Sequence, residues 1–159
     1  MKYHIITIGK IKEKYITLGI DEFLKRLKPY VHVTMTSFSE EKMPDRPSLA
    51  ERVRILDKEG EKIVRAIKDN SYVYALDVQG ELISSEQLAL QLGELTVGGN
   101  SDFTFIIGGP FGLSDKVRQR ADRCISFGRI TLTHQMIRLL LVEQLYRAHK
   151  IQRHEPYHW

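Results

Sequence analysis

The chain has 159 residues, of which 42% are hydrophobic and 28% are charged, with a net charge of +4 and one cysteine. This is an ordinary globular composition, and we expect residues 1–159 to form a single domain with one buried core. One cysteine excludes an intrachain disulfide, and the apolar stretch at residues 5–9 is too short for a signal peptide or a membrane span. We therefore expect a cytoplasmic protein with no membrane partner.

The first part of the chain alternates between strand and helix patterns. β-branched residues predict a strand over 3–9, and apolar residues at helical spacing predict a helix over 15–28 that Pro29 ends. Residues 31–38 alternate as a strand, and a polar loop with two prolines follows at 39–47.

A capping box then opens the second helix. Ser48 and Glu51 have the spacing of this motif. The expected apolar stripe of the helix is Leu49, Val53, Leu56, Gly60, Ile63 and Ile67. A buried strand is predicted over 72–78, with a turn at Gln79-Gly80.

The remaining elements continue the alternation of strand and helix. Ser84 with Gln87 caps a helix that ends near Gly98-Gly99, and residues 103–107 form a strand. Ser114 caps a short helix to about residue 122, a strand follows at 124–127, and Thr133 caps a final helix to about Arg153. Repeated strand and helix units of this length predict an α/β fold, with a mostly parallel sheet and helices on both faces.

Two glycine-bearing turns follow strands in the last third of the chain. They are IIGGPFGLS at Ile106–Ser114 and SFGRITLTHQ at Ser126–Gln135. Glycine permits positive φ and lets a ligand approach the main chain, so these turns predict a backbone-lined pocket for a nucleoside-containing cofactor. The spacing matches neither the phosphate loop of an ATPase nor the dinucleotide fingerprint, and both classes are disfavoured.

Charge is distributed unevenly along the chain. Residues 1–115 hold fifteen Lys or Arg against seventeen Asp or Glu, a net of −2, whereas residues 116–159 hold nine against three, a net of +6. A basic C-terminal third favours a polyanionic partner such as nucleic acid, and a solvated surface is the alternative.

The final helix is apolar nearly all round over its first three turns, from Met136 to Tyr146. A helix of this kind is buried on all sides. We expect one side to pack on the sheet and the other on a second copy of the chain, with a central helix in a monomer as the alternative.

Several segments together resemble the RlmH family of SPOUT methyltransferases. They are the opening IGKIKEKY, the middle ALDVQGELISSEQLA, the glycine turn IIGGPFGLS, the long SFGRITLTHQMIRLLLVEQLYRAHKI and the terminal HEPYHW. The resemblance covers the whole chain. It implies a SPOUT α/β fold with a C-terminal trefoil knot, a homodimer, S-adenosylmethionine as methyl donor, and methylation of N3 of a pseudouridine in 23S ribosomal RNA within the ribosome.

The resemblance also implies where the cofactor binds. The residues that match the family's pocket are Leu76, Gly108, Phe127, Gly128, Arg129, Ile130, Thr131 and Leu132. Phe111 stands inside the glycine turn where a polar or acidic residue is expected. A sulfonium donor carries its own leaving group, and the C-terminal histidines lack the spacing of a zinc helix, so no metal is expected.

The acceptor is an imide N–H, so a base or a group that stabilises its anion aids transfer. We assign a catalytic role at the acceptor base to Tyr157, His158 and Arg138. We assign RNA binding to Arg138, Arg153 and His134, since the forked guanidinium of arginine suits phosphate oxyanions.

Two other functions stay open. One is a methyltransferase that acts on tRNA, because basic patches report phosphate and not base identity. The other is a non-catalytic ribosome-associated RNA-binding protein.

Overall fold

The computed structural model describes residues 1–159 and contains one five-stranded sheet in which every pair of neighbours is parallel. The strands are β1 (Lys2–Ile8), β2 (His32–Phe38), β3 (Tyr72–Leu82), β4 (Asp102–Ile107) and β5 (Arg123–Ser126), in the order β2-β1-β4-β3-β5. The helices are α1 (Lys14–Leu27), α2 (Leu49–Ala66), α3 (Ser85–Val97), α4 (Asp115–Arg120) and α5 (His134–Gln152).

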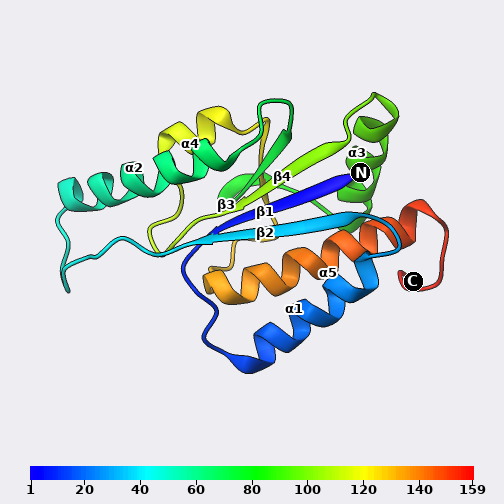
Figure 1. Ribbon diagram of the computed structural model, residues 1–159, viewed down its shortest axis with the longest axis horizontal. Coiled ribbons are helices and arrows are strands. Elements are labelled where there is room, and N and C mark those ends of the chain that lie inside the picture. The colour runs from blue at the N-terminus through cyan, green and yellow to red at the C-terminus, as the bar shows by residue number, and fades with distance from the viewer.

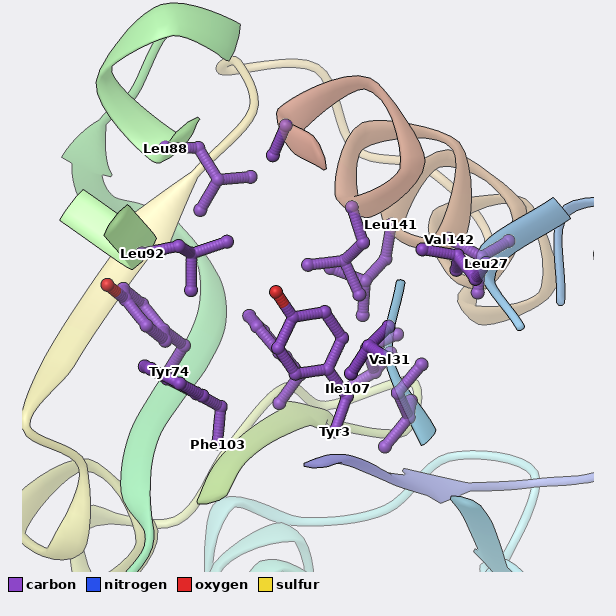
Figure 2. Close-up of a cluster of buried hydrophobic side chains, with 14 of the residues drawn as sticks. Tyr3, Leu27, Val31, Tyr74, Leu88, Leu92, Phe103, Ile107, Leu141 and Val142 are labelled. Carbon is purple, nitrogen blue, oxygen red and sulfur yellow. The ribbon is translucent and has the colours of Figure 1, made fainter. Parts of the chain in front are cut away.

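The helices cover both faces of the sheet, as the sequence predicts (Figure 1). α2 and α4 pack on one face against Ile6, Ile8 and Ile106, whereas α1, α3 and α5 pack on the other. Side chains alternate between the faces along a strand, so β1 contributes to both cores. Figure 2 shows the larger core, in which Tyr3 of β1, Leu88 and Leu92 of α3, and Leu141 and Val142 of α5 gather from three elements.

α5 lies between α1 and α3 within one protomer. Its Leu141, Val142 and Leu145 are fully buried against the sheet, and Gly19 of α1 lets the Leu139 side chain pack closely. Much of the apolar character of this helix is thus explained by contacts within its own protomer, and the expectation that a second copy packs on its other side stays a prediction. The exposed apolar side chain on α5 is Met136, in its first turn.

Two local predictions are wrong. Gln79-Gly80 is not a turn, because β3 continues to Leu82 through an irregular register between Leu76 and Glu81. A Cβ on Gly80 would lie 2.8 Å from the backbone of Cys124, so this glycine permits close strand contact.

The apolar stripe of α2 is also misplaced in its first half. Leu49 and Val53 are 80% and 57% exposed, whereas Ile55, Glu59 and Ile63 are buried. The reason is visible in Figure 1, where the N-terminal turns of α2 extend beyond the carboxyl ends of the strands. The two capping boxes and the caps at Ser114 and Thr133 are confirmed.

The buried side of α5 carries a titratable group that the sequence does not flag. His149 is buried, and its Nε2 lies 3.1 Å from the Tyr3 hydroxyl. Burial lowers the pKa of His149 to about 4, and the positive charges of Arg153 and the N-terminus act in the same direction. The folded protein therefore favours neutral His149.

This depressed pKa predicts acid lability. The contribution of neutral His149 to stability is complete above the unfolded pKa of about 6.5 and is lost as pH falls toward 4, which amounts to roughly 2 to 3 kcal/mol between pH 7 and pH 4.5. Urea unfolding at both pH values measures it. The His149→Gln variant cannot titrate and should show a smaller loss, and equal losses in the two proteins would contradict the assignment.

Candidate functional site

A cavity of about 800 Å³ lies at the carboxyl ends of β4 and β5, beside the middle of β3 where its pairing with β4 ends. Three segments line it: the middle of β3 at residues 76–78, the glycine turn at residues 107–113, and the chain from Ile125 to Ile137 that leaves β5 and begins α5. Ligands of open α/β sheets bind at this edge of the sheet. The structure thus brings the two glycine-bearing turns together around one space.

The first turn is closed on itself. The amide of Gly112 donates to the carbonyl of Gly109 at 3.0 Å, and Gly112 has φ of +84°. A Cβ on Gly108 would overlap the carbonyl oxygen of Gly112 and lie 2.7 Å from its carbonyl carbon. Gly108 is therefore required by the folding of the turn itself, in addition to any approach of a ligand to its main chain.

The second turn is more open. Gly128 has φ of +144°, and a Cβ there would meet no atom within 4 Å. The Ser126 hydroxyl donates to the Gly128 carbonyl at 2.7 Å and accepts its amide at 3.2 Å, which fixes the start of the turn. Ile130 beyond it is 79% exposed. Gly128 is accordingly the glycine at which a ligand can approach bare main chain.

Seven of the eight residues that the sequence assigns to the cofactor line this cavity; they are Leu76, Gly108, Phe127, Gly128, Ile130, Thr131 and Leu132. The exception is Arg129. Its guanidinium donates to the carbonyls of Val78 and Gly80, the latter at 2.9 Å, and so ties the second turn to β3. The side chain of Arg129 thus supports the wall of the cavity without lining it.

The sequence analysis missed a charged pair in the wall. Arg118 of α4 donates to Asp77 at 2.7 Å and to the Leu113 carbonyl at 2.6 Å, which links the middle of β3 to the glycine turn. Burial alone raises the pKa of Asp77, but the Gln79 amide and the Arg118 guanidinium hold it below its ordinary value. The available signal was an aspartate near the end of the buried strand predicted over residues 72–78.

His134 and Gln135 line the cavity from the first turn of α5. The Gln135 carbonyl oxygen accepts the amides of Lys12 and Glu13 at 2.8 and 3.2 Å, which fixes the segment after β1. His134 lies 3.6 Å from Glu40 and faces Gly9. The structure therefore places His134 at the cavity wall, beside the glycine turn, whereas its assigned contact with RNA stays a prediction.

Arg138 lies in the protein interior. It is 1% exposed, and its guanidinium donates to the carbonyls of Ile8 and Gly9 at 2.8 and 2.7 Å. The burial lowers its pKa, and its Nε has no hydrogen-bond partner. A side chain so enclosed cannot contact RNA phosphate or the acceptor base, so both roles assigned to Arg138 are wrong for this conformation.

Tyr157 and His158 lie together on the outer side of α5. The Tyr157 hydroxyl donates to Glu143 at 2.9 Å, and Arg147 lies 4.6 Å from the Tyr157 ring centroid. His158 contacts Glu86 at 2.8 Å and Arg147 at 3.3 Å. Sequence reasoning missed Glu143 and Arg147, although their spacing of four residues in EQLYR predicts an ion pair on one helix face.

The basic surplus of the C-terminal third is mostly paired. Several of its cations lie near carboxylates, some of them from the first 115 residues; these are Arg118, Arg120, Arg123, Arg147 and Lys150. Arg153 differs, because it is exposed and its guanidinium lies 4.7 Å above the Tyr30 ring. Arg153 thus keeps donors that a phosphate can use.

None of the helices has the length and hydropathy needed to cross a bilayer.

Comparison with known proteins gives full-length matches. Residues 1–158 match the family described as "Predicted SPOUT methyltransferase". Proteins named "Ribosomal RNA large subunit methyltransferase H" from Clostridioides difficile, Listeria monocytogenes and Enterococcus faecalis are 52%, 50% and 46% identical to the chain, in each case over 99% of both sequences.

The closed glycine turn generates a prediction about ligand binding. Gly108→Ala should weaken binding of S-adenosylmethionine at least ten-fold, because the added methyl group forces the Gly112 carbonyl out of place. Isothermal titration calorimetry measures the affinity. Gly99→Ala is the control, since Gly99 has φ of +101° but follows α3 and has no atom near its Cβ direction. Equal affinity in wild type and Gly108→Ala would remove the turn from the binding site.

Proposed function

The chain belongs to the SPOUT methyltransferase family, within its RlmH branch, and we propose that it methylates N3 of a pseudouridine in 23S ribosomal RNA. The observation that carries the proposal is the cavity at the carboxyl edge of the sheet, which seven of the eight expected cofactor residues line. We further propose S-adenosylmethionine as the methyl donor.

The cavity residues fit this donor. A volume of about 800 Å³ lies in the range of small-molecule sites, and Leu76, Ile130 and Leu132 supply the apolar surface that an adenine ring needs. The main chain around Gly128 is bare and can offer hydrogen bonds to the ring edge. Once bound, the sulfonium supplies an activated methyl group, and the protein's contribution is to hold the acceptor nitrogen in line with it.

The acceptor imide must lose a proton, and the tail residues offer the chemistry for that step. Burial and the bond to Glu143 raise the pKa of Tyr157, so its hydroxyl remains protonated and acts as a hydrogen-bond donor. His158 is the candidate proton acceptor. The arginine beside Tyr157 and His158 is Arg147, and we propose it in place of Arg138 as the arginine near the acceptor base.

The tail of one protomer is far from its own cavity. Thr133 lines the cavity, and Arg147 follows fourteen residues later, about 21 Å along the helix axis at 1.5 Å per residue. Near the cavity, Ile130, Leu132 and Met136 expose apolar side chains that a second copy can cover. We therefore propose a homodimer in which the tail of each chain serves the cavity of the other.

Two further features of the proposal concern topology and RNA. The chain passes from β5 at the edge of the sheet to α5 on the face opposite α4, and the connecting segment lies beside the glycine turn. This course supports the C-terminal trefoil knot that we expect for a SPOUT fold.

We propose Arg153 as a contact to RNA phosphate, because it is exposed and pairs with no carboxylate.

The function is tested by methyl transfer from labelled S-adenosylmethionine to 70S ribosomes, 50S subunits, free 23S ribosomal RNA and tRNA. We expect transfer to a large-subunit substrate, with mass spectrometry placing the methyl group on N3 of a pseudouridine. Transfer to tRNA alone would favour the tRNA alternative, and binding to ribosomes without any transfer would favour a non-catalytic protein.

The tail generates a second prediction. Deletion of Tyr157–Trp159 should leave the affinity for S-adenosylmethionine within about three-fold and reduce methyl transfer by 100-fold or more, because general acid–base groups contribute on that scale. Calorimetry and a turnover assay measure the two effects. Removal of Trp159 alone, which is 98% exposed, is the matched control.

Mixed dimers test whether the tail acts across the subunit boundary. A tail-deleted chain paired with a Gly128→Val chain should retain one working site, because the intact cavity and the intact tail then meet. Gly128→Val is chosen because a branched residue is strained at φ of +144° beside the cavity. Inactive heterodimers, alongside active wild-type homodimers, would place the tail in its own protomer.

A further inference from the structure

Phe111 is an aromatic side chain that lines the cavity from a closed turn. It occupies the third position of the tight turn Gly109–Gly112, in which the Gly112 amide donates to the Gly109 carbonyl. Pro110 precedes it and fixes its own φ, which further restricts the turn. The side chain is half-buried and lines the cavity. A ring in this position can bind a ligand at little cost in conformational entropy.

Arg52 of α2 lies against this ring. Its guanidinium carbon is 5.3 Å from the centroid of Phe111, the geometry of a cation–π contact, and it is paired with no carboxylate. Arg52 reaches the turn because the first turns of α2 extend past the strand ends, as Figure 1 shows. An aromatic ring of the cavity lining is thus paired with a guanidinium plane that has unused hydrogen-bond donors.

We propose that Phe111 and Arg52 form a stacking subsite for an unpaired nucleobase of the RNA substrate, adjacent to the nucleotide that is methylated. The proposal rests on the RNA methyltransferase function proposed above. A base that is methylated at the cavity brings its chain neighbours close to the cavity lining, which includes half-buried Phe111. Unpaired RNA bases bind proteins by stacking on aromatic rings and arginine planes.

This subsite positions the RNA without reading its sequence, because every base presents a π-face. It also gives Phe111 a role, where the resemblance to the family predicts a polar or acidic residue. The competing role is a contact to the bound cofactor, since Phe111 lines the same cavity. The two roles differ in which ligand loses affinity when the ring is removed.

Steady-state kinetics separates these roles. Phe111→Ala should raise KM for the RNA about 5- to 150-fold, the range for loss of one stacked base, and leave the affinity for S-adenosylmethionine within two-fold. Phe111→Tyr should retain the wild-type KM. Arg52→Ala should raise KM for RNA, whereas Arg54→Ala, which removes an exposed arginine of the same helix, should not.

A spectroscopic readout observes the stacking itself. In a Trp159→Phe background, Phe111→Trp places the only tryptophan in the cavity lining. A ribosomal RNA hairpin with an unpaired loop should quench its fluorescence, and S-adenosylhomocysteine should not. Turnover of the Trp159→Phe protein provides the baseline.

Several outcomes would overturn the proposal. Loss of cofactor affinity in Phe111→Ala, with quenching by S-adenosylhomocysteine, would assign Phe111 to the cofactor site. An unchanged KM for RNA in Phe111→Ala would remove the subsite. Absence of methyl transfer by the wild-type protein would instead defeat the proposed function, and quenching by the hairpin would still report RNA binding at Phe111.

Discussion

The close main-chain packing of the glycine turn at the carboxyl end of β4 is the constraint on which the candidate site depends. Gly108 must lack a side chain because the Gly112 carbonyl occupies the space that a Cβ would take. This contact folds the turn back on itself and leaves Phe111 at its tip. Arg118 then joins the turn to β3 through Asp77 and the Leu113 carbonyl. The cavity therefore has walls that are fixed before any ligand arrives.

A second constraint comes from the position of α5. Its buried stripe packs on the sheet between α1 and α3, and buried Arg138 bonds the carbonyls at the end of β1. These contacts fix the N-terminal end of α5 beside the cavity. The C-terminal tail is consequently held on the far part of the helix, where Tyr157 meets Glu143. The proposed site uses both ends of α5, which is why dimerisation and catalysis belong to one proposal.

Much of the fold could be predicted from local signals. The capping boxes at Ser48 and Ser84, and the helix that ends before Pro29, are local hydrogen-bonding and steric effects. The errors arose where tertiary context decides. In the sequence, Gly80 has the character of a turn residue, but in the structure it permits close strand contact. Leu49 has the character of a core residue, but it lies on helical turns that extend past the sheet.

Arg138 shares the helical spacing of Leu141 and Leu145, so its burial was predictable from periodicity. The pairing of Arg118 with Asp77 was not, because it joins residues 41 positions apart.

The central claim is that the cavity of one chain and the tail of another make one methyl-transfer site. A crystal structure of the protein with S-adenosylhomocysteine tests this claim most directly. The account predicts the adenine ring among Leu76, Ile130 and Leu132, with Tyr157 and His158 from the other subunit facing the sulfur. A ligand bound away from the glycine turns, or a tail that reaches the ligand within its own chain, would contradict it.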